Sequence, residues 1–86
     1  MMFEFDEDKS KSNKDKHGID FVQAQKLWED PECIAIPART TGEARYLLIG
    51  KCDNKIWSAI FIIRNKKIRI ISVRRSRKNE EEIYRI

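Results

Sequence analysis

Three apolar segments follow one another in the second half of the chain, and only two residues separate each from the next. They read ARYLLIGKC, KIWSAIFIIR and KIRIISVRR, joined by Asp53-Asn54 and Asn65-Lys66. Asn tolerates the positive φ that two-residue hairpin turns require. The spacing therefore predicts an antiparallel meander. Residues 57–63 are apolar on both faces, which predicts a central strand with helices against one side.

The first half of the chain predicts a short strand and two helices. MFEFD alternates apolar and acidic residues, which is typical of a strand, and DEDKSKSNKDKHG is a polar helix ending at Gly18. Asp20 and Gln23 have capping-box spacing for a second helix, FVQAQKLWED, which Pro31 ends. CIAIPA then predicts a further strand, and RTTGEA a loop.

This order of elements predicts an α+β fold: a short strand, two helices, a meander of about four strands and a short last helix. Asn79 is the expected cap of that last helix, with Glu80, Glu81 and Glu82 in its first turn. A length of 86 residues suits one domain spanning residues 1–86. The apolar fraction of 41% is too high for a disordered chain.

Positive charge is concentrated towards the end of the sequence. Residues 1–30 carry 5 Lys and 8 Asp or Glu, whereas residues 64–86 carry 9 Lys or Arg and 3 Glu. A basic final third on a folded domain indicates a polyanionic partner, with nucleic acid the first candidate. A solvated charged face with no partner is the alternative.

Several functional classes are disfavoured. Cys33 and Cys52 lie in no CxxC pattern, and with one histidine they do not make a zinc site. One disulfide is conceivable, but a reduced cytosolic pair is expected because nothing marks secretion. The N-terminus lacks the apolar stretch of a signal peptide, and the longest apolar run, residues 56–63, is too short to span a membrane.

The last predicted strand carries cations where it leaves the sheet. Strict alternation would place Ile68, Ile70, Ser72 and Arg74 on one face, and Arg69, Ile71, Val73 and Arg75 on the other. At the strand end Arg74 and Arg75 can leave the core without losing water. Arginine also offers a fixed fork of donors that matches a phosphate group.

Three motifs resemble the BrnT family of bacterial toxins. RIISVRRS, followed by Glu80 and Tyr84, is similar to the family's RIISARRA run with a Glu and a Tyr on the next helix. Gly42-Glu43, Arg45-Tyr46 and Ile49-Gly50 fit its GExRxxxIG pattern. The start of the chain matches FEWDxxKxxxNxxKHGxxFxxA at Phe3, Asp6, Lys9, Asn13, Lys16, His17, Gly18, Phe21 and Ala24.

The resemblance extends over essentially the whole chain. The departures are Val73 and Ser76, where the family usually has Ala, and Arg77, where a small residue is common. The resemblance implies a RelE-like fold and a cytoplasmic toxin that cleaves RNA without a metal or other cofactor. It also implies a BrnA-type ribbon-helix-helix antitoxin in a 2:2 complex, which binds operator DNA.

The RNA cleavage that the resemblance implies would be an internal transesterification, in which the RNA 2′-hydroxyl attacks the adjacent phosphate. Arg74 and Arg75 are the first candidates for holding the phosphate, with Arg69, Lys16 and Arg77 as further RNA ligands. Ser72, His17, Glu43 and Tyr84 complete the catalytic candidates, as hydrogen-bond donors or as acid and base.

Each candidate also has a structural interpretation. Either arginine could pair with Glu80 or Glu81, and Glu43 could pair with Arg45. His17 is favourable at a helix C-terminus in any case. Tyr84 could pack the last helix onto the sheet with Ile83. Trp28 and Trp57 fall on apolar faces that predict core positions.

Two other functions stay open. The chain could bind RNA or its antitoxin without cleaving anything, as a decayed toxin would. It could also bind DNA alone, although no segment has a helix-turn-helix pattern with a basic recognition face.

Overall fold

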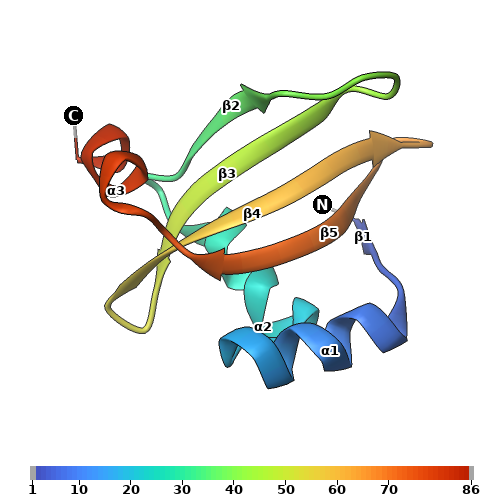
Figure 1. Ribbon diagram of the computed structural model, residues 1–86, viewed down its shortest axis with the longest axis horizontal. Helices are drawn as coiled ribbons and strands as arrows, with labels where there is room; N and C mark the ends of the chain where they lie inside the picture. Colours follow the sequence, from blue (N-terminus) through green and yellow to red (C-terminus); the bar gives the residue numbers. More distant parts are fainter. Residues whose placement is uncertain (1, 86) are drawn as a thin grey trace.

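The structure is a computed structural model that describes residues 2–85. A five-stranded sheet with strand order β1-β5-β4-β3-β2 forms its centre (Figure 1). The elements in chain order are β1 (Phe3–Glu4), α1 (Glu7–His17), α2 (Phe21–Ala24), the 3₁₀ helix η1 (Gln25–Glu29), β2 (Ile34–Ala38), β3 (Arg45–Cys52), β4 (Lys55–Arg64), β5 (Lys67–Arg75) and α3 (Lys78–Tyr84). This confirms the predicted α+β fold.

Strands β2 to β5 form the predicted antiparallel meander, and β1 adds to it in parallel beside β5. Both two-residue turns have positive φ throughout, with 52° and 65° at Asp53 and Asn54, and 53° and 63° at Asn65 and Lys66. These values are typical of the hairpin turn that matches the twist of the flanking strands. The local turn chemistry therefore sets the register of the sheet.

Helix α1 forms without an apolar face. Asp6 caps its N-terminus by accepting from the Lys9 N–H at 3.0 Å, and Gly18, at φ 81°, ends it in the left-handed region. Its buried residues are polar: Ser10 Oγ accepts from the Phe21 N–H at 2.9 Å, and Asn13 bonds to β5. Specific hydrogen bonds, and not apolar packing, therefore fix the position of α1 beside the β5 edge (Figure 1).

The second predicted helix is divided. The capping box of Asp20 and Gln23 forms, but α2 continues as η1, with three residues per turn. That period brings Ala24 and Leu27, both fully buried, onto one line against the sheet. Gly50 in β3 permits the close approach, because a Cβ there would lie 3.0 Å from the Leu27 carbonyl oxygen.

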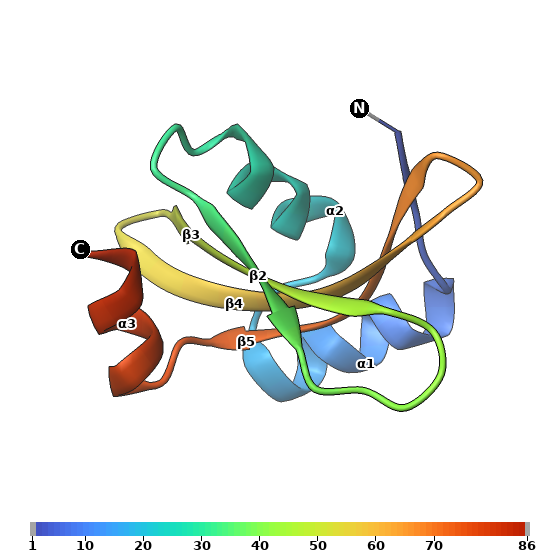
Figure 2. The ribbon, with the colours of Figure 1, turned by 90° about the horizontal axis from the view of Figure 1, so that it is seen from above.

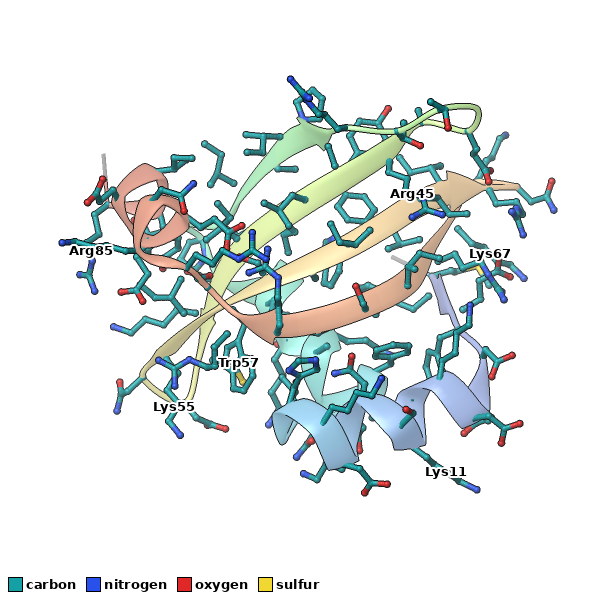
Figure 3. The ribbon with its side chains drawn as sticks, in the orientation of Figure 1. Lys11, Arg45, Lys55, Trp57, Lys67 and Arg85 are labelled. Atoms are coloured by element: carbon teal, nitrogen blue, oxygen red, sulfur yellow. The ribbon has the colours of Figure 1, made fainter. Side chains whose placement is uncertain are left out.

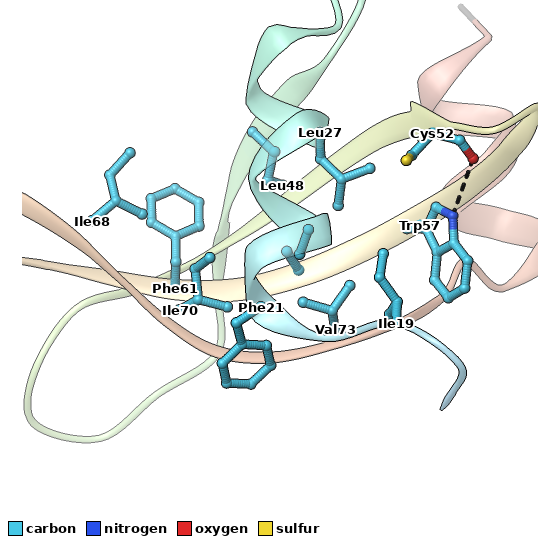
Figure 4. Packing of buried hydrophobic residues seen from close by; sticks show 12 residues of the cluster. Ile19, Phe21, Leu27, Leu48, Cys52, Trp57, Phe61, Ile68, Ile70 and Val73 are labelled. Carbon is cyan, nitrogen blue, oxygen red and sulfur yellow. Dashed lines mark hydrogen bonds between the residues drawn. The ribbon is translucent and has the colours of Figure 1, made fainter. Parts of the chain in front are cut away.

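The sheet has two unequal faces. The face under α2 and η1, which we call the helix face, holds the main core shown in Figure 4. The opposite face, which we call the open face, carries a smaller cluster of Leu47, Ile49 and Ile56, against which Ile83 and Tyr84 of α3 pack. Figure 2 shows α2 and α3 on opposite sides of the sheet. Trp57 lies in the main core and Trp28 packs against it, as predicted.

A β-bulge overturns the predicted alternation in β5. Ile60 pairs with Ser72, but the next residue of β4, Phe61, pairs with Ile70, so Ile71 is an extra residue in β5. Cross-strand partners share a face. The predicted grouping of Ser72 and Arg74 with Ile68 and Ile70 is therefore wrong. Ser72 and Arg74 lie on the open face with Arg69, and Val73 and Arg75 lie on the helix face.

The expected cap of the last helix is also wrong. Helix α3 begins at Lys78, one residue before Asn79, and its N-cap position is Arg77. Glu80 supplies the capping interaction by accepting from the Arg77 N–H at 2.8 Å. None of the helices among residues 2–85 is long and apolar enough to cross a membrane.

Candidate functional site

A groove of about 200 Å³ runs between α1 and the edge of β5, and we call it the α1–β5 groove. The spacing i, i+3, i+4, i+7 places one face of α1 along it. Its lining residues come from both ends of the chain and are Lys9, Ser12, Asn13, Lys16, His17, Ile71 and Ser72. The fold thus brings the predicted residues Lys16 and His17 together with Ser72, which is 55 residues away from His17 in sequence.

Asn13 fixes this groove. Its amide oxygen accepts from the Val73 N–H at 3.1 Å, and its amide nitrogen donates to the Val73 carbonyl at 2.9 Å and to the Ile19 carbonyl at 2.8 Å. The side chain therefore offers β5 the donor and acceptor that a neighbouring strand would offer. As a result α1, and not another strand, lies against this part of the sheet edge.

A buried polar network stands at the end of β5, on the open face. Glu80 is 6% exposed and accepts from both terminal nitrogens of Arg74 at 2.8 Å, so the pairing of Arg74 with Glu80 that the sequence left open does form. Ser58 Oγ also donates to Glu80 at 2.9 Å, and Ser58 bonds Ser76 at 2.8 Å. The Arg74 fork, the Arg77 N–H and Ser58 hold the pKa of Glu80 at about 2, although burial opposes this shift.

Arg74 keeps part of its binding capacity. Nη1 donates to Glu80 and to the Arg75 carbonyl, the latter at 3.2 Å, and Nη2 donates one bond to Glu80. Among the described residues Nε and the second Nη2 hydrogen have no acceptor, and these two donors share one edge of the guanidinium plane. The side chain is 30% exposed. A paired Arg74 can therefore still offer a two-donor fork to a phosphate oxygen.

The other arginines of the predicted cluster point elsewhere. Arg75 is exposed on the helix face, with its guanidinium carbon 5.6 Å from the centre of the Trp57 ring, a cation–π contact. The two neighbouring arginines thus lie on opposite faces, as predicted. Arg77 is exposed at the start of α3. Arg69 lies on the open face with Nη1 3.7 Å from Glu4.

Glu43 and Tyr84 are not among the residues that line the α1–β5 groove. Glu43 pairs with Arg64 at 3.0 Å, and not with Arg45 as the structural interpretation of the sequence allowed. The Tyr84 hydroxyl donates to Asp30 at 2.6 Å, and this bond, aided by burial, raises the pKa of Tyr84 to about 12. Tyr84 also packs on the sheet with α3.

Other reactive side chains are separate from these sites. Cys33 and Cys52 are free thiols, and burial raises the pKa of both, which lowers their reactivity. Within residues 2–85 there is no group of three or more His, Cys, Asp or Glu side chains arranged to hold a metal ion.

Comparison with known protein families gives a match over residues 5–80, to the family described as ribonuclease toxin, BrnT, of type II toxin-antitoxin system. The chain belongs to the BrnT family. The match covers α1, the whole meander and the start of α3, so it includes every element of the site. BrnT proteins are ribonuclease toxins, and membership of a type II system implies an antitoxin partner. No curated protein matches the chain.

Two roles in this BrnT chain were not predicted from the sequence. Glu80 was considered as a helix dipole residue and as a possible arginine partner, but not as the centre of a buried network that also includes Ser58 and the Arg77 N–H. Its position three residues after Arg77 was the available signal, because a glutamate there can bond back to the helix start. Asn13 was matched to a motif but given no role. Helix α1 has almost no apolar face, so polar groups must hold it in place. This was the available signal that Asn13 has a structural role.

Proposed function

We propose that this BrnT protein is a metal-independent endoribonuclease. The 2′-oxygen of RNA forms a bond to the adjacent phosphorus, the bond from phosphorus to the 5′-oxygen breaks, and the products carry a 2′,3′-cyclic phosphate and a 5′-hydroxyl. The observation that carries the proposal is the α1–β5 groove, which brings His17, Lys16 and Ser72 together. Ser72 lies two residues before Arg74 on the same face of β5. We further propose that the protein acts in the cytoplasm, where its RNA substrate is found.

Each side chain has a task that its position permits. The imidazole of His17 takes the proton of the 2′-hydroxyl or returns one to the 5′-oxygen, since a ring nitrogen can either accept or donate a proton. The free fork of Arg74 and the hydroxyl of Ser72 donate to the non-bridging phosphate oxygens, where negative charge grows in the transition state. Lys16 adds positive charge. Arg75, on the other face, and Arg77 are assigned to binding RNA outside the scissile phosphate.

Cleavage of a labelled RNA by the purified protein in EDTA tests the proposal. We expect cleavage to persist and the products to end in 2′,3′-cyclic phosphate. His17→Asn should slow cleavage by about 10²- to 10⁴-fold, and Ser72→Ala by a smaller factor. Lys11→Gln is the matched control, because Lys11 lies on the side of α1 turned away from the sheet (Figure 3). Loss of cleavage in EDTA, or full activity of both groove variants, would overturn the mechanism.

We propose that the antitoxin is a BrnA-type ribbon-helix-helix protein, which forms a 2:2 complex with the toxin and binds operator DNA. The cationic groove and the open face suit a partner that covers them with acidic or apolar residues, so RNA and antitoxin would compete. Light scattering on the complex tests the stoichiometry. Hydrogen exchange tests the surface: an antitoxin that leaves the amides of α1 and β5 unprotected would contradict occlusion of the groove.

One observation favours a second candidate, a module that binds RNA or antitoxin without cleaving. Three of the five N–H groups of Arg74 are already bonded within the protein, two of them to Glu80. A toxin that had lost activity could keep this arrangement for structural reasons alone. RNA that binds in the groove and stays intact over long incubation would support this candidate against the nuclease.

A further inference from the structure

A second groove, about 350 Å³ in volume, lies on the open face. We call it the loop–sheet groove, because it reaches from the β2–β3 loop across β4 and β5 to α1. Its lining residues are Lys9, Thr40, Thr41, Glu43, Arg45, Ile62, Arg64, Arg69 and Ile71. Four of these nine side chains are cationic and one is anionic. The site is therefore strongly positive.

The charges in the loop–sheet groove are available to a ligand. Arg64 pairs with Glu43, but both side chains are about half exposed, at 49% and 48%. The Arg69–Glu4 contact is long, at 3.7 Å, and no other carboxylate of the described residues pairs with Arg69. Arg45 and Lys9 form no ion pair within residues 2–85. Exposed pairs contribute little stability, so a phosphate can replace them at small cost.

The two grooves are adjacent. Lys9 and Ile71 line both of them. Ser72 pairs with Ile60 and Arg69 with Ile62, so the two positions are two residues of β4 apart, which corresponds to about 7 Å at 3.3 Å per residue. A chain that repeats its phosphates can therefore contact both grooves at once. Ile71, which is half-buried, adds apolar surface between the cations, against which an unpaired base or a ribose can lie.

We infer that the loop–sheet groove binds the phosphodiester backbone of single-stranded RNA on one side of the scissile phosphate. This inference rests on the proposed function, which places the scissile phosphate in the α1–β5 groove. It assigns Lys9, Arg45 and Arg64 to substrate binding, and it gives the β2–β3 loop the task of closing one side of the RNA path. Figure 3 shows Arg45 over the sheet near this loop.

The test is the binding of RNA made uncleavable by a single 2′-deoxy nucleotide at the cleavage position. One oligonucleotide ends just beyond that position on either side, and two others are extended by several nucleotides towards the 5′ or the 3′ end. We expect one of the two extended oligonucleotides to bind the wild-type protein more tightly than the short oligonucleotide does. We expect Arg45→Gln with Arg64→Gln to abolish that gain, with a loss of about two- to fivefold for each contact at low salt.

The salt dependence gives a second readout. The slope of log K against log salt for the extended RNA should fall by about 0.7 for each phosphate contact removed from a single strand. Lys11→Gln with Lys55→Gln is the control, because it removes the same charge from exposed positions that line neither groove. A fall of equal size in the control would mean that net charge alone is responsible and would overturn the inference.

The outcomes separate the two proposals. If the short RNA binds and RNA without the 2′-deoxy substitution is cleaved, but neither extension adds affinity, the loop–sheet groove is not part of the RNA path. The nuclease proposal then stands. If duplex RNA gains as much from extension as a single strand does, the assignment to single-stranded RNA is wrong. If no RNA of any length binds or is cleaved, both proposals fall.

Discussion

Replacing Glu80 with glutamine removes the negative charge at the centre of the buried network while keeping the shape of the side chain. The carboxylate accepts hydrogen bonds from both terminal nitrogens of Arg74, from the Ser58 hydroxyl and from the Arg77 N–H. Its pKa falls from the ordinary value of 4.5 to about 2. At about 1.4 kcal/mol for each pH unit, the ionised form contributes about 3 kcal/mol to folding at pH 7. Because Arg74 is 30% exposed, solvent screens part of this.

The sign of the pH dependence follows from the lowered pKa. The stabilisation is complete above the pKa of the unfolded chain, 4.5, and it is lost as the pH falls from there towards 2. Between pH 7 and pH 3 the wild-type protein should lose about 2 kcal/mol through Glu80. Glu80→Gln cannot lose this contribution. The difference in unfolding free energy between the two proteins should therefore shrink by about that amount across the same range.

Urea unfolding followed by tryptophan fluorescence measures this difference at several pH values. Subtracting the variant from the wild type removes the shared contributions of other carboxylates. The matched control is Glu81→Gln, which changes the partly exposed partner of Arg85, 3.8 Å away, and should leave stability within about 0.5 kcal/mol. A wild-type advantage that stays constant from pH 7 to pH 3 would refute the assignment of a buried, ionised Glu80.

Three further predictions concern stability. Asn13→Ala leaves backbone groups of β5 and of the α1–α2 connection without partners and should cost about 2–3 kcal/mol by urea unfolding; unchanged stability would show that water replaces the amide. Gly50→Ala places a methyl group 3.0 Å from the Leu27 carbonyl oxygen, so we expect a loss of about 1–3 kcal/mol and a lower Tm. Tyr84→Phe removes the 2.6 Å bond to Asp30 and should cost about 1–2 kcal/mol, while ultraviolet titration of the wild type should show one tyrosine with a pKa near 12.

Much of the fold follows from local sequence chemistry. Gly18, the capping box at Asp20 and the two Asn-containing turns each specify one conformation, and the structure has all of them. The division of the second helix at Ala24 could not be predicted, since it depends on how closely Gly50, far away in the chain, lets the helix approach the sheet. Patterns within one segment carry no information about such a contact.

The candidate site was predicted less completely. The basic residues were found because charge is visible in the sequence, and the three motif segments were found through their resemblance to the BrnT family. The bulge at Ile71 was not visible, and it reverses the faces of all residues after it, including Ser72 and Arg74. The partner of Glu43 was also unpredictable, because Arg64 comes near it only through the pairing of β3 with β4.

Asn13 joins the beginning of the chain to its penultimate element, and this has a consequence for synthesis. A ribosome releases α1 long before β5, and until β5 emerges the amide of Asn13 lacks two of its three backbone partners, the N–H and the carbonyl of Val73. The α1–β5 groove therefore cannot form on a nascent chain before β5 has been synthesised. If this groove is the site of RNA cleavage, as proposed, the protein gains that activity only in the last stage of its own translation.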